Sequence, residues 1–129
     1  MKAIRVHQFG GPEVLRVEAT ADLSPGLDEI VVDIKAAGIN PVDTYVRSGT
    51  YNPQQPLPYT PGFDGAGLIR AIGQHVSGHT VGERVYISGC RTGTYAEQTA
   101  CHQDQIFPLP SPACWLFGHQ FLLYRADQK

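Results

Sequence analysis

Side chains that can hydrogen-bond or carry charge are concentrated in one short stretch, residues 36–51, which reads AAGINPVDTYVRSGTY. An amide, a carboxylate, two phenols and a guanidinium follow one another closely there. At the edge of a cleft such groups can bind a flat polar ligand, because a phenol both donates to a carbonyl oxygen and stacks against a ring. The five candidate residues are Asn40, Asp43, Tyr45, Arg47 and Tyr51.

The elements that must position these side chains are a strand and a short helix. The apolar pattern of Glu29–Ala37 predicts a buried strand that breaks at Gly38. The Asn-Pro pair at 40–41 is a turn signal, because a residue before proline avoids helical geometry and the fixed φ of proline suits the first turn of a helix. We therefore expect one or two helical turns over Val42–Ser48, ended by Gly49.

Each candidate residue also has a simpler interpretation, and both interpretations stay open. Asn40 can be a turn-former only. Asp43 can be a favourable charge at a helix N-terminus or an ion partner of Arg47, which lies four residues further along. Tyr45 and Tyr51 can be half-buried packing residues.

Other segments have the pattern of short strands separated by turns. Lys2–Gln8 alternates apolar and polar residues and is expected to pair with Val14–Glu18 as a hairpin. Residues 49–62 contain several prolines and predict an irregular loop. The glycines of Pro61–Gly67 precede a strand predicted at Leu68–Ile72. Further strands are predicted within 76–86, 93–100 and 106–110. Such a series favours a small barrel or sandwich.

Size and composition exclude several classes of protein. The chain has 129 residues, 42% hydrophobic and 17% charged, which indicates one modest globular domain. With a net charge of −2 and no Lys/Arg cluster, we expect no nucleic-acid partner. No apolar run is long enough to span a bilayer, and the N-terminus lacks the apolar core of a secretory signal. We therefore expect a cytoplasmic protein without a membrane partner.

The stretch GINPVDTYVRSGTY, followed by PYTPGFDGAG, resembles the medium-chain dehydrogenase/reductase superfamily and, within it, the zinc-free NADPH:quinone oxidoreductases of the zeta-crystallin type. KAIRVHQFGGPEVLRV and VGERVYISGCRTGTYAEQTA are similar landmarks in the expected order, so the match covers roughly residues 1–110. The resemblance implies a mainly β fold, a GroES-like, partly open β-barrel with one or two short helices, which is the catalytic domain of that superfamily.

The resemblance also implies roles for the candidate residues. Asn40, Asp43 and Tyr45 would line the cleft near the nicotinamide of NADPH, as cofactor-binding residues. Tyr51 would lie near a quinone-like substrate. We expect Tyr45, Tyr51 and Arg47 to be the catalytic groups, because phenol and guanidinium groups can polarise a quinone oxygen.

We expect no metal site. Zinc-dependent relatives place a cysteine after the long strand and a histidine in a Pro-Gly-His-Glu stretch, where this chain has Asn40-Pro41 and Pro61–Asp64. Among the histidines only His75 and His79 have a ligand-like spacing, and a catalytic zinc needs three converging ligands. The three cysteines form no CxxC pair and are interpreted as free thiols of a reducing compartment. They are Cys90, Cys101 and Cys114.

The last residues depart from the family pattern. Residues 1–110 are interpreted as the GroES-like domain and 111–129, SPACWLFGHQFLLYRADQK, as a divergent tail that packs poorly. A family member would continue into a Rossmann domain with a glycine-rich turn, and we expect that domain to be absent. The chain is thus expected to be a truncated product.

Two functions are consistent with the sequence. The first is NADPH-dependent reduction of quinones by hydride transfer without zinc, with the chain alone inactive because its coenzyme domain is missing. The alternative is a non-catalytic GroES-like association module, or a truncated splice product, that forms homo-oligomers through the apolar surface left by a missing partner domain.

Overall fold

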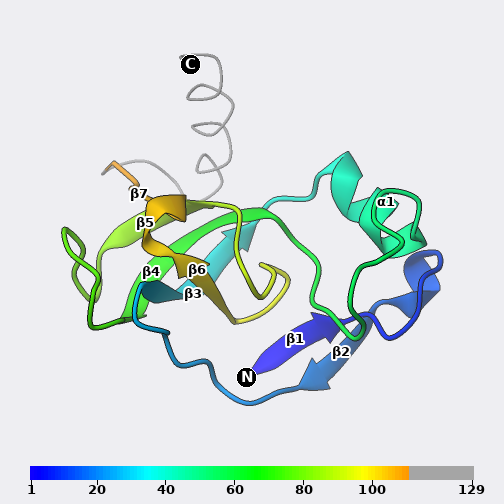
Figure 1. Cartoon of the computed structure of the whole chain (residues 1–129), viewed down its shortest axis with the longest axis horizontal. Helices are drawn as coiled ribbons and strands as arrows, with labels where there is room; N and C mark the ends of the chain where they lie inside the picture. The colour runs from blue at the N-terminus through cyan, green and yellow to red at the C-terminus, as the bar shows by residue number, and fades with distance from the viewer. Residues whose placement is uncertain (111–129) are drawn as a thin grey trace.

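The computed structural model describes residues 1–110, which fold into two antiparallel sheets and one α-helix (Figure 1). The larger sheet has the strand order β6-β3-β4-β5-β7, and the smaller one pairs β1 with β2. The strands are β1 (Lys2–Arg5), β2 (Arg16–Ala19), β3 (Glu29–Ala37), β4 (Asp64–Ile72), β5 (Arg84–Ser88), β6 (Gln98–His102) and β7 (Ile106–Pro108); the helices are α1 (Pro41–Ser48) and the 3-10 turns η1 (Pro12–Val14) and η2 (Gln103–Gln105).

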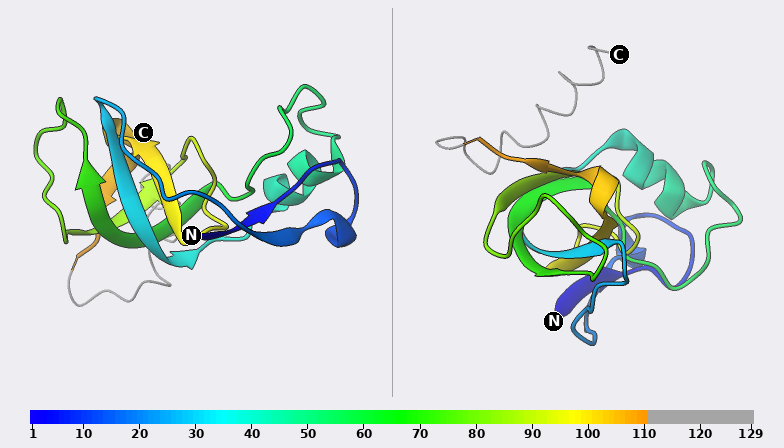
Figure 2. Two further views of the ribbon diagram at one scale, coloured as in Figure 1. Left: turned by 90° about the horizontal axis from the view of Figure 1, so that it is seen from below. Right: turned by 60° about the vertical axis from the view of Figure 1, so that its left-hand side comes forward.

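The five-stranded sheet is strongly curled around its own core, whereas β1, β2 and α1 lie together at the other end of the molecule (Figure 2). Strands β6 and β7 are its two edges, and within residues 1–110 no ladder joins them, so the sheet does not close. The expected mainly β, partly open architecture with short helices is confirmed.

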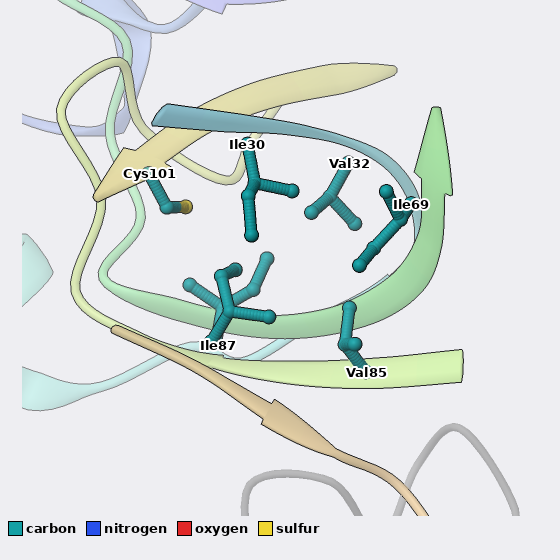
Figure 3. Packing of buried hydrophobic residues seen from close by; sticks show 7 residues of the cluster. Ile30, Val32, Ile69, Val85, Ile87 and Cys101 are labelled. Carbon is teal, nitrogen blue, oxygen red and sulfur yellow. The ribbon is translucent and has the colours of Figure 1, made fainter. Parts of the chain in front are cut away.

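The core lies inside the curl and is built from alternate residues of neighbouring strands (Figure 3). Successive side chains of a strand point to opposite faces, so positions two apart face the same way. Ile30 and Val32 of β3 therefore meet Val85 and Ile87 of β5 across β4. The cluster is completed by Ile69, Cys101 and Ile106, each no more than 3% exposed.

Strand β4 begins at Asp64, so the prediction that Gly65 and Gly67 precede the strand is wrong. The reason is a close approach of β3, whose register against β4 shifts twice along the ladder. A Cβ at Gly67 would collide with the carbonyl oxygen of Asp33. Glycine in a strand interior marks such an approach.

The predicted hairpin forms, but its strands are shorter than expected. β1 ends at Arg5 and β2 begins at Arg16, in the register Lys2↔Ala19 to Arg5↔Arg16. Val14 lies in η1 instead of the strand, and its side chain is buried there.

Helix α1 confirms the prediction made from its two ends. Pro41 is its first residue, and Gly49 ends it in the left-handed region at φ 82°. The Gly49 N–H donates to the carbonyl oxygen of Val46, as a glycine cap does. None of the helices within residues 1–110 is long and apolar enough to cross a membrane.

Candidate functional site

A pocket of about 490 Å³ lies between α1, the loop before β4 and the loop after β5. Its volume falls in the range of small-molecule sites. The wall combines hydrogen-bonding groups with apolar ones such as Val42, Val46 and Phe63. The polar side chains of the wall are Asp43, Tyr51, Gln55, Tyr59, Thr60, Cys90 and Arg91.

Asp43 has two hydrogen-bond donors that fix its carboxylate at the pocket wall. Its Oδ2 accepts from the backbone N–H of Asn40 at 2.8 Å and from the Tyr95 hydroxyl at 3.2 Å. The first bond caps the N-terminus of α1, because Asp43 is the third residue of the helix. Burial, and then the negative charge of Asp43, raise the pKa of Tyr95, so its phenol stays protonated and can donate to Asp43 even above its ordinary pKa.

Asn40 faces Asp64. Its Nδ2 donates to Asp64 Oδ1 at 2.9 Å, and the Asp64 residue is only 5% exposed. Gly38 leaves room for this contact, since a Cβ there would collide with the Asp64 carboxylate. The amide of Asn40 therefore joins the end of β3 to the start of β4.

Arg47 links α1 to the N-terminal loop. Its Nε donates to the carbonyl oxygen of Gly10 at 3.3 Å, and the Gly10 N–H donates to the Arg47 carbonyl oxygen at 3.0 Å. Among residues 1–110 the Arg47 side chain is directed to Gly10 and forms no ion pair with Asp43. The two residues line a separate cavity of about 120 Å³ together with Tyr95.

The two candidate tyrosines lie in different places. Tyr51 lines the large pocket although it is 67% exposed. Tyr45 is 52% exposed and is not among the residues of the pocket wall within 1–110. Of the five candidate residues, the structure thus brings Asp43 and Tyr51 to the pocket and leaves Asn40, Tyr45 and Arg47 outside its wall.

Several pocket residues were not singled out as site residues from the sequence. Gln55 and Thr60 come from the proline-rich loop, whereas Cys90 and Arg91 follow β5. The Arg91 guanidinium donates to Glu29 at 2.6 Å, and this bond holds the pKa of Glu29 below its ordinary value. Segments this far apart in sequence meet only through the sheet, so no local pattern marks them.

Phe63 occupies the position where zinc-dependent relatives were expected to carry a ligand. It is 53% exposed and lines the pocket. No group of three or more His, Cys, Asp or Glu side chains within residues 1–110 is placed to hold a metal ion.

Residues 26–111 match the family of the alcohol dehydrogenase GroES-like domain. The chain belongs to this family. Its relatives include the quinone oxidoreductases of Sus scrofa, 44% identical over 111 residues, and Homo sapiens, 42% identical over the same length. Both alignments cover 85% of this chain.

Solved structures of the same kind share the fold of this GroES-like domain. The quinone oxidoreductase of Escherichia coli in complex with NADPH superposes with a TM-score of 0.84 at 35% identity. That superposition covers 89% of this chain and 35% of the Escherichia coli chain. The chain also spans only 34% of the length of the Sus scrofa and Homo sapiens relatives.

Proposed function

We propose that this chain supplies the substrate-facing wall of a zinc-free, NADPH-dependent quinone reductase. The observation that carries the proposal is the pocket beside α1, in a chain 44% identical to the quinone oxidoreductase of Sus scrofa. The wall has hydrogen-bond donors and apolar side chains, which together suit a quinone ring. Bound NADPH would supply the hydride.

Tyr51 and Phe63 are the residues placed to bind the ring. Both line the pocket and are more than half exposed, so a flat molecule can reach their faces. The Tyr51 hydroxyl would donate to a quinone oxygen, on which negative charge develops as the ring is reduced. Thr60 and Gln55 offer further donors on the same wall.

The remaining candidates would act around the pocket. We assign Asn40 and Arg47 to positioning α1, since their side chains bond Asp64 and the Gly10 carbonyl. Asp43, fixed by Tyr95, would orient a donor of the nicotinamide carboxamide. Tyr45 remains a catalytic and coenzyme-contact candidate on the exposed side of α1.

The domain division is part of the proposal. We propose that residues 1–110 form the GroES-like domain and that a separate nucleotide-binding domain presents the coenzyme. The 129-residue chain alone would then turn over negligibly in the cytoplasm. The expectation of a poorly packed tail at 111–129 falls outside the described residues and stays a prediction.

Activity assays test this function in two forms of the protein. The 129-residue chain, mixed with NADPH and a naphthoquinone, should show no NADPH oxidation above the uncatalysed rate. A chimera in which residues 1–110 replace the corresponding segment of the Sus scrofa relative should reduce the quinone, and a zinc chelator should leave its rate unchanged. A folded chimera that binds NADPH but reduces no quinone would argue against the proposal.

The exposed apolar side chains around α1 favour a second candidate, an association module. Ile39, two residues before α1, is 81% exposed, and Tyr45 of α1 is 52% exposed. Phe63, which shares the pocket wall with residues of α1, is 53% exposed. Burying such groups drives association. Light scattering of the 129-residue chain that shows a defined dimer, together with an inactive chimera, would favour this function over the reductase.

A further inference from the structure

Cys90, in the loop after β5, packs against the core beside Cys101 of β6. The Arg91 N–H donates to the carbonyl oxygen of Ala100 at 2.9 Å, and the Ala100 N–H donates to Thr92 Oγ1 at 2.9 Å. Both polar backbone groups of Ala100 thus point toward the 91–92 segment. These bonds hold the 91–92 segment against β6, and the neighbouring Cys90 packs against the core cluster that contains Cys101.

The two side chains share an environment but differ in access. Cys101, on β6, is fully buried and directs its sulfur into the core (Figure 3). Cys90 packs against the same cluster, yet it is only half-buried and lines the 490 Å³ pocket. A small molecule in the pocket can therefore contact Cys90, whereas Cys101 is fully buried.

The surroundings make one thiol acidic and keep the other protonated. A hydrogen bond from the Cys101 thiol is the largest cause that lowers the pKa of Cys90 to about 7, and Thr99 and the Gly93 backbone act in the same direction against burial. The same contact, with burial, raises the pKa of Cys101 far above its ordinary value. Only the thiolate form of a cysteine is strongly nucleophilic.

We propose that Cys90 is a peroxide-reactive thiol and that Cys101 is its resolving partner, so that a hydroperoxide entering the pocket converts the two cysteines to a disulfide. This site does not depend on which molecule the pocket binds as substrate. It rests on the packing of Cys90 against the core beside Cys101 and on the access of Cys90 from the pocket.

The reaction balances with the hydroperoxide as the only oxidant. The Cys90 thiolate attacks the terminal peroxide oxygen, so an S–O bond forms, the O–O bond breaks, and the leaving oxygen takes a proton to depart as water or an alcohol. The Cys90 sulfur loses two electrons and becomes a sulfenic acid. Once Cys90 is a neutral sulfenic acid, the thiolate charge that raised the pKa of Cys101 is gone. The Cys101 sulfur then attacks the Cys90 sulfur, an S–S bond forms, the S–O bond breaks, and the hydroxyl leaves as water with the Cys101 proton.

The product requires that the Cα atoms of Cys90 and Cys101 come to lie roughly 4.4–6.8 Å apart. Bond formation would also draw the Cys90 sulfur from the Gly62 carbonyl oxygen, 3.5 Å away, toward the core. The pocket wall would therefore change on oxidation.

Mass spectrometry of the 129-residue chain with Cys114→Ser tests the proposal, because that change removes the third thiol. After treatment with about one equivalent of hydrogen peroxide, the chain should lose about 2 Da and yield a peptide pair linked through Cys90 and Cys101. With Cys101→Ser added, a cyclic diketone should trap Cys90 as its sulfenic-acid adduct. With Cys90→Ser added, no adduct should form at Cys101.

Three results would overturn the proposal. The first is the absence of the linked peptide in the folded chain, and the second is adduct formation at Cys101 when Cys90 is replaced. The third is an equal yield of the linked peptide in urea, because that result would mean that the fold does not direct the reaction. Circular dichroism of each variant establishes that it is folded, and the parent with Cys114→Ser alone carries the test if a second substitution prevents folding.

Discussion

The side-chain amide of Asn40 donates to the buried carboxylate of Asp64 at 2.9 Å, which joins the residue before α1 to the first residue of β4. The backbone N–H of the same Asn40 donates to Asp43 at 2.8 Å. One residue thus ties the long central strands to the helix that borders the pocket. The contribution of Asn40 to stability can be measured without any ligand, and thus apart from a role in ligand binding.

Asn40→Ala should lower the free energy of unfolding by about 1–3 kcal/mol, because the buried carboxylate of Asp64 loses a donor. Urea denaturation measures this change. Gln74→Ala, at an exposed position, is the control and should stay within about 0.5 kcal/mol of the parent. Equal effects of the two substitutions would mean that the amide contributes nothing to stability.

Tyr95→Phe should make the chain less sensitive to alkaline pH. The pKa of Tyr95 is raised by burial and by Asp43, so the folded chain keeps this proton after the unfolded chain loses it near pH 10. The stability is present below that pH and is lost as pH rises further. Urea midpoints between about pH 9 and 11 should fall less steeply in the variant.

Some alkaline loss should persist in Tyr95→Phe, since burial also raises the pKa of Tyr59. Tyr45→Phe is the matched control, because that ring is exposed. If the urea midpoint of Tyr95→Phe falls with pH as steeply as that of the parent, the Tyr95 phenol does not cause the alkaline loss of stability. At neutral pH the lost bond to Asp43 should cost about 1 kcal/mol.

Alkylation of Cys90 by iodoacetamide should reach half its maximal rate near pH 7, because the thiolate forms as pH rises through the lowered pKa of about 7. Cys101→Ala removes the strongest donor and should move this midpoint to higher pH. Both measurements use the Cys114→Ser background and quantify the modified peptide. An unchanged midpoint in Cys101→Ala would show that the Cys101 thiol does not lower the pKa of Cys90.

In the chimera, Tyr51→Phe should lower kcat/KM for the quinone by about tenfold, equivalent to ~1.4 kcal/mol of lost transition-state stabilisation. Its KM for NADPH should not change, because Tyr51 lines the pocket proposed to bind the quinone. Tyr45→Phe should instead act on the KM for NADPH if that phenol contacts the coenzyme. The reverse pattern of effects would exchange the roles assigned to the two tyrosines.

The helix and the sheet were largely predictable from local signals. Pro41 and Gly49 set the ends of α1, and alternation of apolar residues located the strands. The early start of β4 was missed, because Gly65 and Gly67 look like a turn until the close approach of β3 is known. A glycine can mark either a turn or the close approach of a neighbouring strand, and the sequence alone does not distinguish the two.

The contacts that build the site depend on register and could not be predicted. Asn40 meets Asp64 only because β3 and β4 pair antiparallel with Ala37 opposite Gly65. Cys90 meets Cys101 because Arg91 bonds Ala100. A shift of one residue in either pairing would turn these side chains to opposite faces.

Pro108 gives the outer side of β7 a further property. Leu109 donates its N–H inward to Arg84, so alternation turns the backbone of Pro108 outward, where a proline has no hydrogen to donate. Pro110 follows with the same deficiency two positions on. This border of the sheet therefore offers fewer donors to a foreign strand, which disfavours aggregation by edge-to-edge growth at that side.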